Sequence, residues 1–132
     1  MSESRTLSIS IPCDWQVLYE RIWRPEYFPE WASGLSDADL RREGAVWKAT
    51  GPNGTVGIRF TGHNDFGVMD HWVELPDGQT VYVPLRVIAN GAGAEVQLTL
   101  LRQPWMTEDK FETDTEWVKR DLEKLKQLAG ST

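Results

Sequence analysis

The hydrophobic period of this chain changes at residue 35 and again after Pro104, and these changes restrict its fold more than any other feature. Between those points, apolar and polar residues alternate in short runs, as in strands with one buried face. After Pro104 the spacing becomes helical. One helical stripe contains Phe111, Thr115, Val118, Leu122, Leu125 and Ala129. The sequence therefore predicts an antiparallel meander followed by one long C-terminal helix of about twenty residues.

The alternating region predicts several hairpins. Gly, Pro, Asn and Asp separate its runs at short intervals, and Gly-Pro-Asn-Gly at 51–54 is a strong turn signal. Pro84 lies inside one run and cannot donate a ladder hydrogen bond, so we expect a bulge or an edge position there. The predicted strands span residues 35–42, 45–50, 55–62, 66–75, 79–90 and 94–103.

The first 34 residues predict one strand and two short helices. In residues 5–11, apolar side chains alternate with Ser and Thr, which indicates a half-buried strand. Asp14 can cap the helix that follows, and Pro25 can open a second helical piece that ends at Gly34. The apolar face of the first helix is expected to contain Trp15, Leu18, Tyr19 and Ile22.

Composition restricts the class of protein. At 132 residues the chain has the size of one domain, spanning residues 1–132. Its formal charge of −6, without a Lys/Arg run, argues against a nucleic-acid partner. No apolar run approaches the ~20 residues that span a bilayer, and the first residues lack a signal-peptide pattern. We therefore expect a cytoplasmic protein without stable membrane insertion, and the single Cys13 agrees with a reducing compartment.

Two polar residues, His71 and Arg102, interrupt the strand face that should pack against the long helix. One interpretation is structural: His71 is a hydrogen-bonded core residue, and Arg102 pairs with an acid such as Asp114 or reaches water. The other is functional: both bind the polar end of a ligand whose apolar body lies between sheet and helix. The apolar members of this face are Val56, Ile58, Phe60, Met69, Val73, Val81, Val83, Leu85, Val87, Val96, Leu98 and Leu100.

The opposite strand face carries charged and hydroxyl side chains, as expected for a solvated side of the sheet. Within this set, Asp70 lies between Arg59 and Arg86, which predicts charge pairing across strands. Outside the strands, four large side chains are expected in loops that can rim an opening. These are Phe28, Trp31, Trp105 and Met106. Tryptophans more often occupy core or interface positions, which is the alternative for Trp15, Trp23, Trp31, Trp47 and Trp117.

Patterns for catalysis or metal binding are sparse. Two histidines and one cysteine at separated positions do not supply the three or four ligands of a metal site, so no metal or cofactor is expected. Neither a phosphate-binding glycine loop nor a Gly-x-Ser-x-Gly elbow is present. His71 is the candidate for acid/base catalysis, and whether the protein is an enzyme stays open.

The order strand, helix, short helix, six strands, long helix resembles the START-like or SRPBCC superfamily, also called polyketide cyclase/dehydrase-like. Residues 11–32, with the aromatic-rich Pro-Glu-x-x-Pro-x-Trp at 25–31, are similar to its opening segment. Residues 66–73, 81–87 and 100–111 are similar to segments of uncharacterised bacterial members. The resemblance implies an α+β helix-grip fold, in which a curved antiparallel sheet of about seven strands wraps around the C-terminal helix, with two short helices after the first strand.

The resemblance also implies a cavity between the sheet and the C-terminal helix, which in many members holds apolar or amphipathic small molecules. Binding such a molecule is our leading hypothesis. The alternatives are a cyclase, dehydratase or aromatase that uses His71 and Arg102, and an interaction protein of the chaperone-activator or toxin-like kind. A homodimer stays open as an assembly. The expected lining is Phe60, Met69, His71, Val83, Leu85, Leu98, Leu100, Arg102, Phe111 and Val118.

Overall fold

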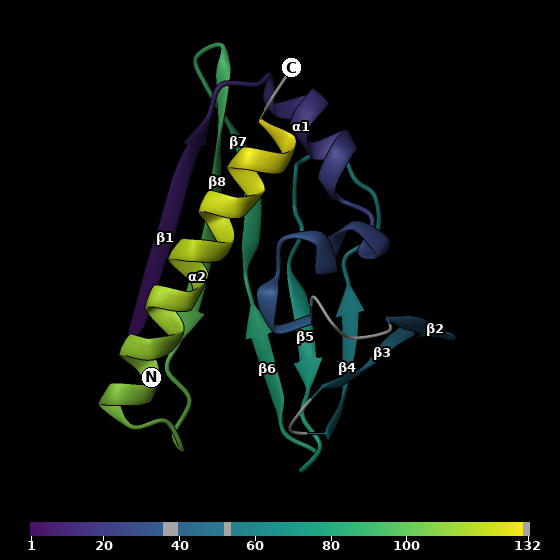
Figure 1. Ribbon diagram of the computed structural model, residues 1–132, viewed down its shortest axis with the longest axis vertical. Helices are drawn as coiled ribbons and strands as arrows, with labels where there is room; N and C mark the ends of the chain where they lie inside the picture. The colour runs from purple at the N-terminus through teal and green to yellow at the C-terminus, as the bar shows by residue number, and fades with distance from the viewer. Residues whose placement is uncertain (36–39, 52–53, 131–132) are drawn as a thin grey trace.

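The computed structural model describes residues 1–35, 40–51 and 54–130 of the chain. Within these ranges, eight strands and two α-helices follow one another, with two short 3₁₀ helices after the first α-helix. Figure 1 shows their arrangement. In chain order they are β1 (Ser4–Ile11), α1 (Trp15–Ile22), η1 (Pro25–Glu30), η2 (Ser33–Leu35), β2 (Arg41–Glu43), β3 (Val46–Gly51), β4 (Gly54–Phe60), β5 (His71–Glu74), β6 (Thr80–Val83), β7 (Leu85–Asn90), β8 (Gly93–Leu101) and α2 (Glu108–Ala129).

The strands form two antiparallel sheets. The first has the order β1-β8-β7, and the second has the order β2-β3-β4-β5-β6. Within the second sheet every neighbour in space is also a neighbour along the chain, which confirms the predicted meander. The first sheet brings the N-terminal strand onto β8, with Ser4 opposite Leu101 and Ile11 opposite Ala94.

The two sheets meet at Pro84, between β6 and β7. β6 pairs with β5, and β7 pairs with β8, so the extended segment changes partner at the proline. Pro84 has no N–H to donate, but its carbonyl accepts a hydrogen bond from the Thr99 N–H at 3.0 Å. The expected irregularity at this position is therefore a strand break, and it explains why the predicted strand 79–90 appears as two.

The strand predicted at 66–75 is shorter than expected, because β5 begins only at His71. The Asn64 side chain holds the preceding segment in a turn: its Oδ1 accepts from the Val68 N–H, and its Nδ2 donates to the Val68 carbonyl. Gly67 has a φ of 68°, which favours glycine. Val68 contributes only an isolated bridge to Arg86.

At the start of the meander, β2 begins at Arg41, and the first part of the strand predicted at 35–42 lies outside the described residues. The predicted hairpin at 51–54 is confirmed by the pairing of β3 with β4, although residues 52–53 of its turn also lie outside them.

α1 begins after Asp14, whose carboxylate accepts from the N–H groups of Gln16 and Val17. Pro25 opens η1 as expected, but η1 ends at Glu30 and Gly34 lies inside η2, so the predicted stop at Gly34 is wrong. Pro29 inside η1 explains the short 3₁₀ geometry, because a proline prevents a regular ladder.

α2 lies along the three-stranded sheet and packs on β1 (Figure 1). Thr107 caps it by accepting from the Lys110 N–H, and every residue of its predicted stripe is buried or half-buried. Ser33 of η2 donates to Asp121 of α2 at 2.6 Å, which ties η2 to this helix. Among the helices within the described ranges, none combines the length and the apolar character needed to cross a membrane.

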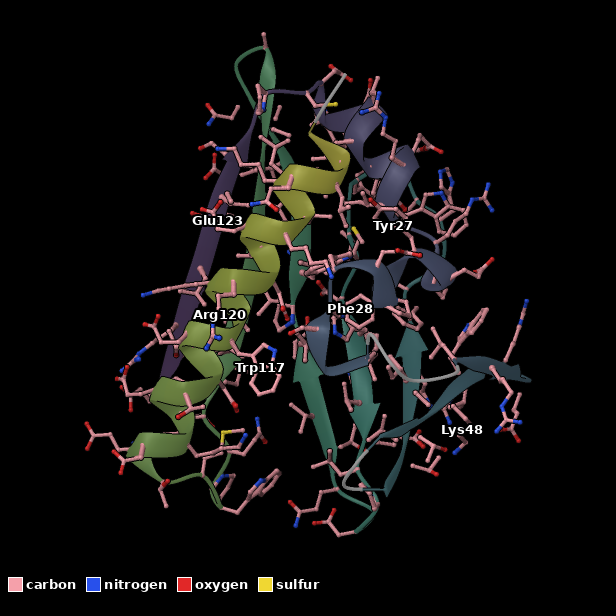
Figure 2. All side chains as sticks on the ribbon, viewed as in Figure 1. Tyr27, Phe28, Lys48, Trp117, Arg120 and Glu123 are labelled. Carbon is pink, nitrogen blue, oxygen red and sulfur yellow. The ribbon has the colours of Figure 1, made fainter. Side chains whose placement is uncertain are left out.

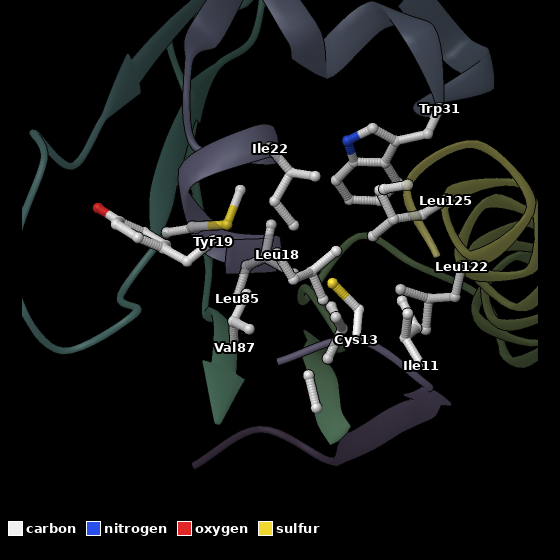
Figure 3. Close-up of a cluster of buried hydrophobic side chains, with 14 of the residues drawn as sticks. Ile11, Cys13, Leu18, Tyr19, Ile22, Trp31, Leu85, Val87, Leu122 and Leu125 are labelled. Atoms are coloured by element: carbon white, nitrogen blue, oxygen red, sulfur yellow. The ribbon is translucent and has the colours of Figure 1, made fainter. Parts of the chain in front are cut away.

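The hydrophobic core joins α1, η1, β7, β8 and α2, and Figure 3 shows much of it in close-up. Burial of this apolar surface is the main stabilising contribution expected for the fold. Trp31, for which both a core position and a place at the rim of an opening were predicted, is one of the largest core members and is 1% exposed. Other fully buried members include Ile11, Leu18, Ile22, Leu85, Val87, Val96 and Leu125.

Candidate ligand-binding site

His71 is the first residue of β5 and lies between β4 and β6, opposite Phe60 and Val83. It is 3% exposed. Its Nδ1 lies 3.2 Å from the Met69 carbonyl oxygen, which can only accept, so Nδ1 carries the proton in the neutral ring and Nε2 carries the lone pair. Burial lowers the pKa of His71, against smaller opposing effects of the Met69 carbonyl and Asp70. The neutral imidazole is therefore favoured.

Aromatic rings surround the His71 imidazole. The ring centroid of Phe28 lies 5.0 Å from it in an edge-on contact, and that of Phe60 lies at 5.8 Å. Phe28 also makes edge-on contacts with Phe60 and Trp31. Figure 2 shows Phe28 between η1 and the five-stranded sheet. η1 thus covers His71 with an aromatic layer.

A small recess lies beside His71, with a volume of about 10 Å³. This is about the space of one water molecule, so one small group fits there without movement of side chains. α1, η1 and their junction form one wall, and the sheet forms the other. The lining consists of Ile22, Trp23, Arg24, Phe28, Phe60, Thr61, Met69, His71 and Leu85.

An open groove of about 320 Å³ shares four lining residues with the recess, namely Trp23, Arg24, Phe60 and Thr61. It runs between the α1–η1 junction and the β2–β3 turn, and the end of β4 forms its floor. This volume lies at the lower end of the range for small-molecule sites. The remaining lining residues are Pro25, Glu26, Arg42, Gly44, Ala45, Trp47 and Gly62.

Trp23 lines both the recess and the groove. Its buried indole Nε1 has no hydrogen-bond acceptor among the residues that the structure describes. A buried donor without an acceptor is costly. The guanidinium of Arg24 stacks on the Trp23 ring, with Cζ 4.9 Å from the ring centroid.

Four of the predicted lining residues meet at the recess: Phe60, Met69, His71 and Leu85. Phe60, His71 and Leu85 belong to strands, and Met69 lies just before β5. Five others belong to the packed core or to its edge and are not among the lining of the recess or of the groove. These are Val83, Leu98, Leu100, Phe111 and Val118.

Arg102 lies away from the recess, just beyond β8. Its Nη1 pairs with Glu3 at 3.2 Å, and its Nε donates to the Met106 carbonyl at 3.3 Å. Asp114, its suggested partner, pairs instead with Lys110. This placement matches the structural interpretation of Arg102, with an N-terminal acid in place of a helix acid.

The alternation of the strands does not predict the part of the lining that comes from α1, η1 and the residues between them. Ile22, Trp23, Arg24 and Thr61 were not among the predicted site residues, and Phe28 was predicted only as a residue that can rim an opening. The available signal was the aromatic-rich segment 23–31, whose prolines prevent one regular helix and leave rings free to turn toward the sheet.

On the other face of the sheet, Asp70 forms a buried network and is 4% exposed. Its carboxylate accepts from the Tyr82 hydroxyl at 2.7 Å, the Leu85 N–H at 2.9 Å and the Arg86 guanidinium at 2.9 Å. Burial alone would raise the pKa of Asp70, but these hydrogen bonds together outweigh burial and lower it. The predicted Asp70–Arg86 pairing is confirmed, whereas Arg59 pairs with Glu74 instead.

Across the described ranges, His, Cys, Asp and Glu side chains do not gather in groups of three that could hold a metal ion. The candidate site consists of an aromatic recess with one neutral histidine and an adjoining groove with tryptophan and arginine side chains.

The sequence matches no protein-family model, and no curated protein matches it. Solved structures do match. The protein XoxI from Bacillus cereus has a TM-score of 0.74 at 16% identity, with 98% of this chain and 96% of that chain covered. A START superfamily protein from Mycobacterium smegmatis has a TM-score of 0.68 at 7% identity, with 96% of each chain covered. The Aha1 dimer from Colwellia psychrerythraea has a TM-score of 0.69 at 14% identity, with coverages of 97% and 96%. The chain therefore has the START-like helix-grip fold.

Proposed function

We propose that this protein binds one small apolar or amphipathic molecule, with its inner end at the His71 recess and its body in the adjoining groove. The observation that carries the proposal is that the recess and the groove adjoin, because Trp23, Arg24, Phe60 and Thr61 line both. An aromatic inner end and a more polar outer end are typical of small-molecule sites. The START-like fold of its structural neighbours supports the same class of function.

The position of this site differs from the cavity expected between the sheet and α2. Phe111 and Val118, the α2 residues of the predicted lining, contribute to neither the recess nor the groove. Instead, α1 contributes to the recess, and η1 with the residues just before it contributes to both. The proposed ligand therefore lies on the expected face of the sheet, but α1 and η1 cover it.

His71 supports a binding role more directly than a catalytic one. As a neutral ring with Nδ1 hydrogen-bonded to Met69, it offers Nε2 as an acceptor for a hydroxyl or amide group of a ligand. Proton transfer would also require a reacting group within hydrogen-bond reach of that nitrogen, and the recess admits one small group. The proposal accordingly concerns binding.

An interaction surface is the second candidate, because Trp72 stacks on Tyr82 on the outer sheet face at a centroid distance of 5.3 Å. Trp72 is exposed. Charged pairs flank this ring pair, with Arg59–Glu74 on one side and Arg86–Asp70 on the other. An apolar patch interrupted by ion pairs fits a docking surface less well than the groove fits a ligand.

The test uses 2-naphthol, a flat neutral bicyclic probe, and two matched tryptophan variants. Ala45 lines the groove and is exposed, so Ala45→Trp should fill the groove without disturbing the core. Ala92 is exposed in the turn between β7 and β8 and does not line the groove, so Ala92→Trp is the control. By calorimetry, we expect one probe molecule to bind to the unmodified protein and to Ala92→Trp, and binding to Ala45→Trp to be lost.

Equal binding of 2-naphthol to Ala45→Trp and the unmodified protein would contradict the proposed site. Absence of binding to the unmodified protein would contradict the proposed function itself. Native mass spectrometry of gently purified protein then identifies any small molecule that it carries, and Ala45→Trp should carry none.

A further inference from the structure

We infer that the ligand of this site carries an anionic group at its outer end, held between Arg24 and Arg42. The inference rests on the proposed binding function and specifies the chemical class of its ligand: a flat apolar body that bears a carboxylate or a similar oxyanion. The two guanidinium groups belong to opposite walls of the groove. Arg24 lies between α1 and η1, and Arg42 lies in β2 opposite Trp47.

Ion pairing distinguishes Arg24 and Arg42 from four other arginines of the chain. Arg5, Arg59, Arg86 and Arg102 each pair with a carboxylate. In contrast, neither Arg24 nor Arg42 has an ion-pair partner among the described residues. Arg42 donates through Nε to the Gly44 carbonyl at 3.1 Å, which orients its guanidinium, and Arg24 stacks on Trp23. Two oriented guanidinium groups at one opening suit a carboxylate or another planar oxyanion.

The groove lining has more basic than acidic residues, unlike the chain as a whole. The whole chain has 14 basic and 20 acidic residues, a net charge of −6. The groove lining reverses this balance, because it contains Arg24 and Arg42 against a single acid, Glu26. A local positive field in an acidic protein favours an anion over a cation at this place.

The walls specify the body of the ligand. Trp23, Trp47 and Phe60 line the groove and present aromatic surface to it. Flat rings stack well on such surface. An aromatic acid can therefore lie with its ring between these side chains, its carboxylate at the arginines and its far end toward His71.

The experiment compares 6-hydroxy-2-naphthoate with 2-naphthol, which shares the ring and the hydroxyl group but lacks the carboxylate. Calorimetric titrations are made on the unmodified protein and on the variants Arg24→Gln, Arg42→Gln and Arg120→Gln. Arg120 is exposed on α2, as Figure 2 shows, and is the control for loss of one positive charge. Circular dichroism and thermal unfolding verify that each variant is folded.

We expect the unmodified protein to bind the naphthoate more tightly than 2-naphthol. Arg24→Gln and Arg42→Gln should each weaken naphthoate binding about threefold or more, since exposed charge pairs contribute modestly. Each variant should weaken naphthoate binding by a larger factor than 2-naphthol binding. Arg120→Gln should change neither. Added 0.5 M salt should weaken naphthoate binding alone, because salt screens exposed charges.

The outcomes separate this inference from the proposed function. Equal affinity for both probes, with no effect of Arg24→Gln and Arg42→Gln, would overturn the anionic group and leave the binding function intact. Failure of both probes to bind would overturn both. Equal weakening by Arg120→Gln would show a general charge effect and would overturn the assignment to Arg24 and Arg42.

Discussion

At the scale of single residues, Asp70 supplies a hydrogen-bond acceptor at the point where the strand ladder is interrupted, next to Pro84. The segment changes sheets at Pro84, and the next N–H, that of Leu85, donates to the Asp70 carboxylate at 2.9 Å. Arg86 and Tyr82 complete the set of donors. A buried carboxylate with this many partners is stable as an anion, and its removal leaves several donors unpaired.

We therefore predict that Asp70→Asn lowers the free energy of unfolding by about 3 kcal/mol, because it leaves a buried network without its charge. The matched control is Glu74→Gln, which removes the carboxylate of the surface pair with Arg59 and should cost less than about 1 kcal/mol. Urea unfolding measures both. Equal losses in the two variants would contradict the special role of Asp70.

At the scale of secondary-structure elements, α2 is stabilised mainly by one face. Its buried residues Phe111, Thr115, Leu122, Leu125 and Ala129 follow helical spacing, while the rest of its surface is largely charged. Helices in proteins gain most of their stability from such packing rather than from intrinsic propensity. Two leucines only three positions apart therefore differ sharply in importance.

Leu125 is 0% exposed and Leu128 is 45% exposed on the same helix. We predict that Leu125→Ala lowers the free energy of unfolding by about 3 kcal/mol, because it leaves a cavity in the core. Leu128→Ala should change it by less than about 0.5 kcal/mol. Thermal and urea unfolding of the two variants compare the sites, and a large effect of Leu128→Ala would show that α2 packs by another face.

The elements that depend on local pattern could be predicted from the sequence. The stripe of α2 and the inward positions of Met69, His71, Leu85 and Val96 follow from periodicity alone. The position of the recess could not be predicted this way, because it depends on how η1 packs its rings over β5. The alternation along a strand identifies which residues point inward. It does not identify the segment of the chain that packs over those residues.

The same limit applies to Arg102 and Asp70. Alternation predicts Arg102 on the inward face, but β8 ends just before it, and the N-terminal segment supplies Glu3 as its partner. Asp70 was assigned to a solvated face, and its burial follows from the junction of the two sheets at Pro84. Pairings between distant segments decided both outcomes, and a single sequence carries little information on such pairings.

At the scale of the whole molecule, stability should depend on pH through His71. Its pKa is lowered in the folded state because of burial, so between that value and about 6.5 the unfolded chain binds a proton that the folded chain does not. The free energy of unfolding therefore falls as pH decreases below about 6.5. The contribution of Asp70 is lost at lower pH, as its own lowered pKa is approached.

We predict that His71→Asn, whose amide can still donate to the Met69 carbonyl, reduces the slope of stability against pH between pH 6.5 and 5. One proton accounts for a slope of at most about 1.4 kcal/mol per pH unit. Between pH 7.5 and 8, where His71 is neutral in both states, the two proteins should have equal slopes. Urea unfolding across this range measures the difference, and identical profiles throughout would contradict the prediction.

The pairing of β1 with β8 also has a consequence for biosynthesis. Residues 4–11 pair with residues 94–101, so β1 cannot pair until the ribosome has synthesised β8. At ordinary rates of translation this delay is on the order of ten seconds. During that time the apolar side chains of β1 have no sheet to join, and the three-stranded sheet closes late. A ribosome stalled before β8 would therefore expose an unpaired strand, which is the form of a nascent chain that chaperones protect from aggregation.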